Sequence, residues 1–265
     1  ATHDAKRGED ARMRLAALSE LPQLFAEALK ALGSCARGRR QRVGSRLTPD
    51  RNEAYFLYQA LLAHPPLAEA EVAAFGERLK PYLVKALREA KEHSNWQSPD
   101  EQAEQAYLAY ADNLLEADPA VAYPAAFLAL WQRVVRVGLV NSLSQTLLKI
   151  TAPGLPDFYQ GTEFWDFSMV DPDNRRPVDF ALRHTTLEQL ALAEAADRGA
   201  LLADMVAHAD DGRIKLFLIW KGLAARRELA ELYRKGDFRP LEFSGGRQGM
   251  AGATAVGRGG QPAAL

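Results

Sequence analysis

The sequence has a single cysteine, Cys35, among its 265 residues, so no internal disulfide bond can form. Cysteine-poor chains without disulfides are typical of the reducing cytoplasm, where we expect this protein to act. No apolar run reaches the roughly 18 residues that a membrane span needs. The formal net charge of −1 gives no field that would attract nucleic acid or an anionic membrane. We therefore expect neither kind of partner.

Signals for bound cofactors are also missing. No cluster of histidines and cysteines has the spacing of a metal site, and no glycine-rich loop has the pattern that cradles phosphates. We therefore expect no cofactor and no metal. The chain opens without methionine and inside a polar motif, which favours a piece of a longer protein. Five arginines between Arg37 and Arg46 indicate a solvated loop, with an anionic partner as the alternative.

Apolar residues recur at spacings of three and four along most of the chain, which predicts a mainly helical protein. After a cap at Asp10, one such pattern runs to Leu32, and Gly33 supplies a stop. A serine cap at Ser98 and a glutamate three residues later predict another helix start. Further helices are predicted over Arg51–Ala63, 72–90 with a kink at Pro81, 124–131, 139–150, 186 onward and 213–235.

One short segment, 155–159, has the composition of a β-strand: it is partly aromatic and lies between Gly154 and Gly161. A helix followed by a short strand that ends in a polar loop is the repeating unit of a (β/α) barrel. Catalytic residues of such barrels lie at the carboxyl ends of the strands. The residues from Ser244 onward are rich in glycine and alanine without periodicity, so we expect no structure of their own there.

The densest polar cluster is at the start of the chain, where His3 and Asp4 are followed by Lys6 and Arg7. Such a cluster can bind sugar hydroxyls through charge-assisted hydrogen bonds. The two cations also favour an ionised carboxylate. Taken alone, a His-Asp pair also occurs as a metal ligand set and, more often, as ordinary surface residues.

Several segments in order resemble the maltooligosyltrehalose synthase family of α-amylase-type enzymes, and the resemblance covers residues 1–243. The segment after Gly154 alone would indicate only the broader α-amylase family, and the helical segments make the resemblance more specific. The segments are THDAKRGED at 2–10, PDRNEAY and LYQALL within 49–62, KALREAKEH at 85–93, NSLSQTLLK at 141–149, GLPDFYQGTE at 154–163 and DPDNRRPVD at 171–179.

The resemblance implies a fold that is mainly α as it stands, containing the C-terminal part of a (β/α)8 barrel (strands seven and eight) with a large helical insertion. Residues 1–32 would be the end of strand seven and its following helix. Residues 33–137 would be the insertion, and 138–243 the last strand, its loop and the closing helices. Residues 244–265 would be a disordered or truncated tail.

The resemblance also implies residue roles. Asp4 would be the third catalytic carboxylate, which grips ring hydroxyls of the transferred sugar as it approaches an oxocarbenium-like transition state. His3 would bind the same sugar, and Lys6 and Arg7 would lie at the rim near the acceptor glucose. Ala5 stands where the family has threonine, which removes at most a local hydrogen bond.

The family's reaction is an intramolecular transglycosylation: the reducing-end α-1,4 bond of a maltooligosaccharide becomes an α,α-1,1 bond. The enzyme is formally an isomerase, a glucosylmutase, and its product implies coupling to a maltooligosyltrehalose trehalohydrolase. The family's nucleophile and acid/base precede residue 1, so we expect the isolated chain to be inactive. Two alternatives are another α-1,4-glucan hydrolase or glucanotransferase of the α-amylase family, and a non-catalytic helical scaffold.

Other polar and aromatic residues have two interpretations each. Tyr159 and Gln160 lie at the predicted strand end, where contact with a sugar and a structural role are equally open. Glu163 is expected to brace the following loop rather than act as an acid. Residues 173–175 are expected to fix a turn, and Trp96 to pack in the core rather than stack on a sugar.

Overall fold

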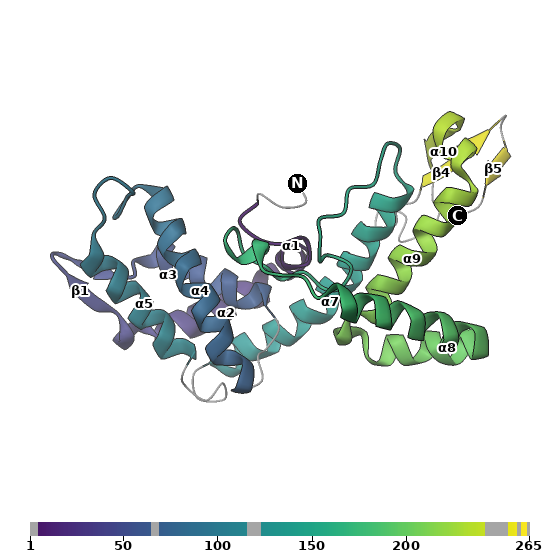
Figure 1. The fold of residues 1–265 in the computed structure, drawn as a ribbon. Helices are drawn as coiled ribbons and strands as arrows, with labels where there is room; N and C mark the ends of the chain where they lie inside the picture. Colours follow the sequence, from purple (N-terminus) through teal and green to yellow (C-terminus); the bar gives the residue numbers. More distant parts are fainter. Residues whose placement is uncertain (1–4, 65–68, 116–122, 242–253, 259–260, 264–265) are drawn as a thin grey trace. The chain divides into compact units, whose positions relative to one another are not determined.

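The computed structural model describes residues 5–64, 69–115, 123–241, 254–258 and 261–263 (Figure 1). The chain divides into two compact units, which we describe separately. Unit 1 comprises Ala1–Ser142 and Trp165–Asp179, and unit 2 comprises Leu143–Phe164 and Phe180–Leu265. The expectation of a mainly helical chain is confirmed. None of the described helices has both the length and the apolar character that crossing a bilayer requires.

Unit 1 is a group of helices with one small hairpin. Its elements are α1 Glu9–Ala16, η1 Ala17–Glu20, α2 Pro22–Cys35, η2 Arg37–Arg39, β1 Gln41–Val43, β2 Arg46–Thr48, α3 Arg51–Ala63, α4 Glu69–Ala90, α5 Glu101–Leu115, the first part of α7 Ala125–Thr151, and η3 Asp173–Arg175.

Helix α3 has the predicted bounds because the signal at its start is local. The side chain of Asp50 accepts hydrogen bonds from the backbone N–H groups of Asn52 and Glu53, both at 2.8 Å. In return, Oε2 of Glu53 accepts from the N–H of Asp50 at 2.6 Å. This reciprocal capping box satisfies donors that a helix start otherwise leaves free.

Three helix predictions are corrected. The pattern over 10–32 is two α-helices, because Pro22 has no N–H to donate and must begin a new helix, with Leu21 (φ −128°, ψ 40°) as its N-cap. Helix α2 then continues through Gly33 to Cys35. Helix α5 is capped by Asp100, whose carboxylate accepts from the N–H of Ala103 at 2.9 Å, and not by the serine two residues earlier.

The segments 124–131 and 139–150 are one continuous helix, α7, and not two. Gly138, which weakens a helix, is present for packing instead. A Cβ at Gly138 would lie 2.4 Å from Cγ of Arg14 on α1. The glycine therefore permits close approach of two helices in unit 1.

The core of unit 1 is formed by α3, α4, α5 and the first part of α7. Tyr82, Tyr110 and Phe127 are among its largest fully buried side chains, and burying a side chain of this kind stabilises the fold by about 1.5–3 kcal/mol. Some buried polar groups of this core are paired. The indole N–H of Trp131 donates to the carbonyl of His64 at 2.6 Å, for example.

The arginine-rich stretch is more ordered than the predicted loop. It forms η2 and the antiparallel hairpin β1–β2, in which Val43 is the partner of Arg46. Gly44 adopts φ +58°, which the tight turn requires and which glycine adopts without strain. Val43 is buried with Ala103 and Ala106 of α5, so one apolar contact fixes the hairpin on the helix.

The start of the chain pairs with residues 166–170, far along the sequence. The N–H of Gly8 donates to the carbonyl of Ser168 at 2.6 Å, and Arg7 and Met169 form an antiparallel bridge. The N–H of Asp166 donates to Oδ2 of Asp10 at 2.6 Å. A Cβ at Gly8 would lie 2.5 Å from a carboxylate oxygen of Asp166, so only glycine fits there.

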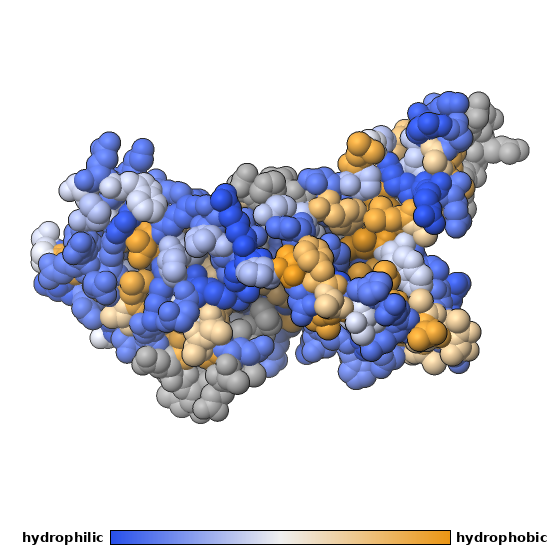
Figure 2. Space-filling model, in the orientation of Figure 1, coloured by the Kyte–Doolittle hydropathy of each residue, from blue (hydrophilic) through white to orange (hydrophobic). Residues whose placement is uncertain are grey.

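Unit 2 contains the end of α7, then α8 Phe180–Ala207, η4 Ala209–Asp211, α9 Arg213–Glu228, α10 Ala230–Lys235 and the antiparallel sheet β3–β4–β5. Its core is small, built around Leu190, Leu201, Met205 and Leu216. Many large apolar side chains of this unit are exposed, and orange patches mark such surface in Figure 2.

The sheet corrects the expectation for the tail. Strands β4 Thr254–Arg258 and β5 Gln261–Ala263 lie within the segment that we expect to lack structure, and β4 pairs with β3 Asp237–Pro240. Composition misses these strands because they depend on pairing: β4 pairs with β3, outside the tail, and β5 pairs with β4.

The segment 155–159 is neither helix nor strand in the described chain. A strand needs a paired neighbouring strand, and these residues form no β-ladder with other described residues. Leu155 is 96% exposed. The segment is held at its start by Arg226, whose guanidinium donates to the carbonyls of Ile150, Ala152 and Gly154.

Candidate functional site

A cavity of about 570 Å³ lies between α3 and α4 in unit 1. Its walls are largely apolar with a few polar groups, as in many small-molecule sites. The lining residues are Lys6, Asn52, Glu53, Tyr55, Phe56, Gln59, Leu83, Ala86, Leu87, Glu89, Ala90, Glu92, His93 and Tyr107.

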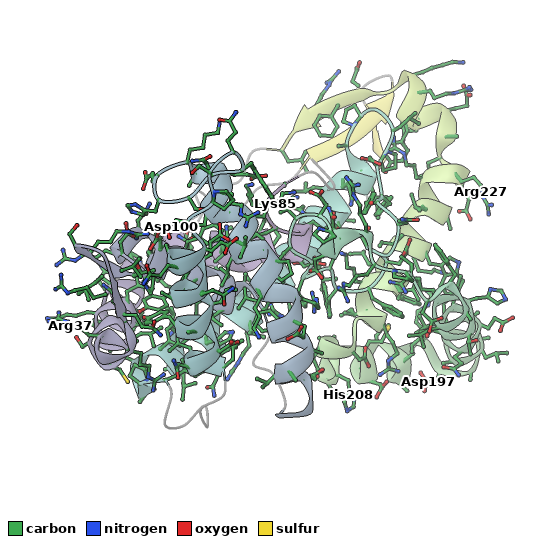
Figure 3. All side chains as sticks on the ribbon, turned by 60° about the vertical axis from the view of Figure 1, so that its left-hand side comes forward. Arg37, Lys85, Asp100, Asp197, His208 and Arg227 are labelled. Carbon is green, nitrogen blue, oxygen red and sulfur yellow. The ribbon has the colours of Figure 1, made fainter. Side chains whose placement is uncertain are left out.

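Lys6 reaches this cavity from the N-terminal segment. Its ammonium group donates a hydrogen bond to the carboxylate of Glu89 on α4. Lys85, labelled in Figure 3, lies on the same helix and donates to Asp171 at 2.6 Å. Partial burial and the nearby charge of Lys85 lower the pKa of Lys6, and Asp171 opposes this effect. Lys6 is thus held in a mixed charge cluster at the edge of the cavity.

Arg7 contacts two residues of the cavity lining. Its guanidinium lies 5.0 Å from the ring centroid of Phe56, within the range of a cation–π interaction. Its Nη2 donates to Oε1 of Gln59 at 3.4 Å. Of these two residues predicted from the sequence, Lys6 lines the cavity and Arg7 lies against two of its lining side chains.

Four other residues are predicted from the sequence to belong to a site. His3 and Asp4 lie outside the described residues. Tyr159 and Gln160 belong to unit 2. The carbonyl of Tyr159 accepts hydrogen bonds from the N–H and hydroxyl of Thr162, and Gln160 is exposed.

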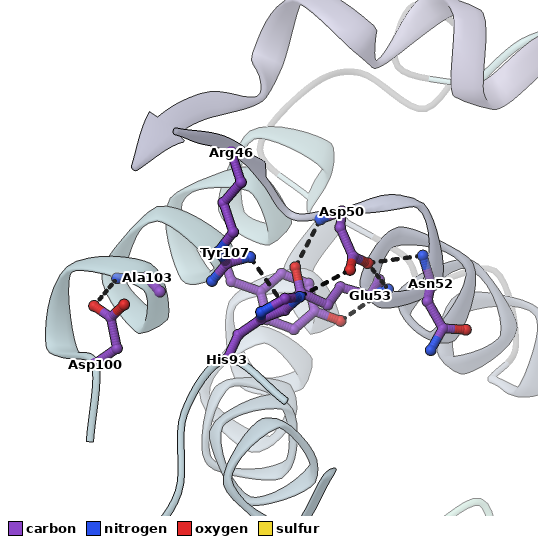
Figure 4. A network of polar contacts seen from close by, with 8 residues as sticks. All are labelled: Arg46, Asp50, Asn52, Glu53, His93, Asp100, Ala103 and Tyr107. Carbon is purple, nitrogen blue, oxygen red and sulfur yellow. Dashed lines mark hydrogen bonds and ion pairs between the residues drawn. The ribbon is translucent and has the colours of Figure 1, made fainter. Parts of the chain in front are cut away.

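One end of the cavity contains a polar network, shown in Figure 4. Nε2 of His93, in the turn after α4, lies 3.0 Å from Oδ2 of Asp50 and 4.0 Å from Oε1 of Glu53. Nη1 of Arg46 lies 3.5 Å from the same Glu53 oxygen. The hydroxyl of Tyr107 donates to the carbonyl of Glu53 at 2.8 Å. Four parts of unit 1 (the hairpin, α3, the turn after α4 and α5) thus meet here.

The pKa values of the two carboxyls in this network shift in opposite directions. Burial raises the pKa of Glu53, despite opposing contacts. Burial alone would also raise the pKa of Asp50, but the capping N–H groups and His93 outweigh it and lower that pKa. The ligand-type atoms of Asp50, Glu53 and His93 lie within 4.8 Å of one another, so this group could hold a metal. Sequence spacing could not reveal it, because His93 is 43 residues from Asp50.

Three further expectations have clear outcomes. Glu163 braces its loop, since Nε of Arg183 lies 2.8 Å from its carboxylate. Residues Asp173–Arg175 form the turn η3, as expected. The expected core position of Trp96 is wrong. Its side chain is 56% exposed, and Cζ of Arg88 lies 5.0 Å from the centroid of its ring.

No protein-family model matches the chain. Putative maltooligosyl trehalose synthases of two Mycobacterium tuberculosis strains are each 36% identical to it over 189 residues. These matches cover 71% of this chain, which spans only 23% of the length of each relative.

Solved structures give the same result. A crystal structure of a maltooligosyl trehalose synthase matches 92% of this chain with a TM-score of 0.76 and 32% identity, and the match covers 31% of that protein. The maltooligosyltrehalose synthase of Arthrobacter ramosus matches 97% of this chain, again with a TM-score of 0.76 and 32% identity. The match covers 30% of the Arthrobacter chain.

Proposed function

The chain belongs to the maltooligosyl trehalose synthase family, and from this membership we propose that it is part of an enzyme that makes maltooligosyltrehalose. The enzyme would convert the reducing-end α-1,4 bond of a maltooligosaccharide into an α,α-1,1 bond. The observation that carries the proposal is the match to solved synthases over 92–97% of this chain. The reaction class is an isomerisation by a glucosylmutase, and we place it in the cytoplasm.

In the proposed reaction, the bond from the anomeric carbon to O4 of the terminal glucose breaks. The same carbon then bonds to O1 of that glucose, so no water is consumed and one reducing end disappears. We assign Asp4 to grip the ring hydroxyls of the transferred sugar near the transition state, with His3 on the same sugar. We assign the nucleophile and the acid/base, which this mechanism also needs, to parts of the family's sequence that this chain does not cover.

We propose that Lys6 and Arg7 bind the acceptor glucose. Lys6 lines the cavity between α3 and α4, and Arg7 contacts its lining residues Phe56 and Gln59, which supports a shared ligand. The guanidinium Nε of Arg7 is buried without a hydrogen-bond partner among the described residues. A sugar hydroxyl could accept from such a donor.

We further propose that 155–159 is the last strand of a (β/α)8 barrel, with Tyr159 and Gln160 at its carboxyl end. The composition of the segment and the 96% exposure of Leu155 support this assignment, because an apolar side chain this exposed fits burial against further parts of a barrel. The solved relatives have about three times the length of chain, enough to supply the other strands.

The test uses the complete enzyme and maltopentaose. Loss of reducing ends without glucose release supports synthesis, whereas rising reducing power would indicate hydrolysis by another α-amylase-type enzyme. Asp4→Asn should lower kcat by about two orders of magnitude or more, as losing one transition-state contact commonly does. Asp112→Asn, in an exposed ion pair with Lys80, is the control and should retain full activity. Near wild-type turnover of Asp4→Asn would exclude the role given to Asp4.

The isolated 265-residue chain provides a second test. We expect no turnover from it, because a retaining mechanism needs two further carboxylates. Measurable turnover by this chain alone would refute the assignment of the nucleophile and the acid/base to sequence that this chain does not cover.

Coupling to a maltooligosyltrehalose trehalohydrolase is a related proposal. It predicts that adding that hydrolase to the complete enzyme converts the non-reducing product to free trehalose.

A further inference from the structure

Two carboxylates and one imidazole meet at one end of the α3–α4 cavity, and we propose that Asp50, Glu53 and His93 bind a divalent transition-metal ion of the zinc class. Zinc is held by imidazole and carboxylate ligands at about 2.0–2.2 Å, which in a tetrahedral site places ligand atoms about 3.3 Å apart. The imidazole Nε2 lies 3.0 Å from Oδ2 of Asp50 and 4.0 Å from Oε1 of Glu53. All three atoms lie within 4.8 Å of one another. Small side-chain movements would complete this geometry.

The capping box of α3 orients both carboxylates. One oxygen of Asp50, Oδ1, accepts from two backbone N–H groups, which leaves Oδ2 directed toward His93. One oxygen of Glu53, Oε2, accepts from the N–H of Asp50, which leaves Oε1 for another partner. Supporting hydrogen bonds of this kind fix the direction of metal ligands.

Oε1 of Glu53 provides a second, independent observation that points to a ligand at this position. The Glu53 side chain is only 9% exposed, and Oε1 accepts no hydrogen bond from the described residues. Its nearest cation is Nη1 of Arg46 at 3.5 Å, and both terminal nitrogens of Arg46 are themselves buried without hydrogen-bond partners in the described chain. Burying a carboxylate oxygen in this way is costly. A bound metal ion would satisfy it.

The mixed donor set selects the class of ion. Calcium takes six to eight oxygen ligands and magnesium prefers an octahedron of oxygens, whereas imidazole suits zinc, copper and nickel. Glu53 and His93 both line the cavity, so a fourth position would face it and accept water or a ligand hydroxyl. The charge of Arg46 opposes a cation, so it weakens binding and balances Glu53 when no metal is present.

The experiment titrates the 265-residue chain with Zn²⁺ by calorimetry and with Co²⁺ by visible absorption, which reports tetrahedral coordination. We expect one ion per chain. His93→Ala and Glu53→Gln should each weaken binding by more than about 100-fold, since even outer partners of a metal site contribute roughly 10–100-fold. His184→Ala, which removes an exposed imidazole 3.3 Å from Glu188, is the control and should bind like the wild type.

Two further measurements keep the test decisive if one variant folds poorly. Glu53→Gln retains an oxygen for the capping bond to Asp50, so its far-UV circular dichroism should match the wild type. Arg46→Gln should tighten binding several-fold, because it removes a positive charge beside the ion. No stoichiometric binding by the wild type, or unchanged binding in His93→Ala, would refute the site.

Discussion

Replacing Asp173 by alanine should strongly destabilise unit 1, because this carboxylate connects three separate parts of it. Its oxygens accept from Nε and Nη2 of Arg78 on α4, at 2.7 and 2.9 Å. They also accept from the N–H of Met169 at 2.8 Å and lie 2.8 Å from Nε of Arg176. The side chain of Asp173 is only 4% exposed. Alanine would leave Arg78 and the buried Met169 amide without these partners.

The expected loss in the free energy of unfolding follows from the groups that alanine leaves without a partner, Arg78 and the Met169 amide. Removing one partner of a buried ion pair commonly costs about 3–5 kcal/mol, and we expect Asp173→Ala to lie in that range. Asp112→Ala, which removes an ion pair with Lys80 of about one-third exposure, should cost less than about 1 kcal/mol. The contrast between the two variants therefore isolates the effect of burial from the effect of charge.

The assay is urea unfolding followed by tryptophan fluorescence. Three of the four tryptophans, Trp96, Trp131 and Trp165, lie in unit 1, so the signal reports mainly on that unit. If Asp173→Ala loses no more free energy of unfolding than Asp112→Ala, the hydrogen-bond argument is refuted.

The pH dependence gives a second readout. Burial alone would raise the pKa of Asp173, but the hydrogen bonds from Arg78 and Met169 outweigh it and lower that pKa in the folded state. Between the folded and the unfolded pKa of Asp173, the unfolded chain binds more protons than the folded one, so stability rises with pH over this range. The contribution of the Asp173 carboxylate to the free energy of unfolding is complete above its unfolded pKa of about 3.9. It is lost as the pH falls through the lower pKa of the folded state. The gap between wild type and Asp173→Asn should shrink over the same range.

Three other substitutions test packing and charge in unit 1. Gly33→Ala should stabilise by about 0.5–1 kcal/mol, because a methyl group on this helical glycine would have no neighbour within 4 Å among the described residues outside its own turn of helix. Gly138→Ala should destabilise by about 1–3 kcal/mol, because its Cβ would meet Arg14. Each variant's melting temperature is compared with that of the wild type, and a shift opposite to the expected one refutes the argument for that glycine. Glu104→Gln should cost about 1.5–3 kcal/mol at pH 7, because Arg88 donates two hydrogen bonds to this carboxylate and lowers its pKa. That cost should diminish as the pH falls through the lowered folded pKa of Glu104, and a constant cost in urea titrations from pH 7 to pH 3 would refute the assignment.

Features with local causes could be predicted from the sequence. The bounds of α3 follow from Asp50 and Glu53, which are three residues apart and cap one helix. Glu163 was also predictable as a structural residue, because loop carboxylates commonly find a nearby cation such as Arg183. One short polar motif also singles out Lys6 and Arg7, and Lys6 lines the cavity of unit 1; their contact with a sugar stays a prediction.

Features with distant causes could not be predicted. Gly138 looks like a helix breaker until its contact with Arg14 is known. The segment 155–159 has the composition of a strand, yet strand formation depends on a partner that the described chain does not provide. The group of Asp50, Glu53 and His93 depends on a tertiary contact between the start of α3 and the turn after α4.

The pairing of the N-terminal segment with residues 166–170 also affects how the protein folds during synthesis. The hydrogen bond between Asp10 and the N–H of Asp166 joins positions 156 residues apart. Closing so long a loop costs entropy before the contact is formed, and such contacts slow folding. Lys6 and Arg7 therefore leave the ribosome long before the segment with which they pair, and unit 1 can be completed only after residue 179 has been made. Until then, the backbone groups around Arg7 and Gly8 lack these partners.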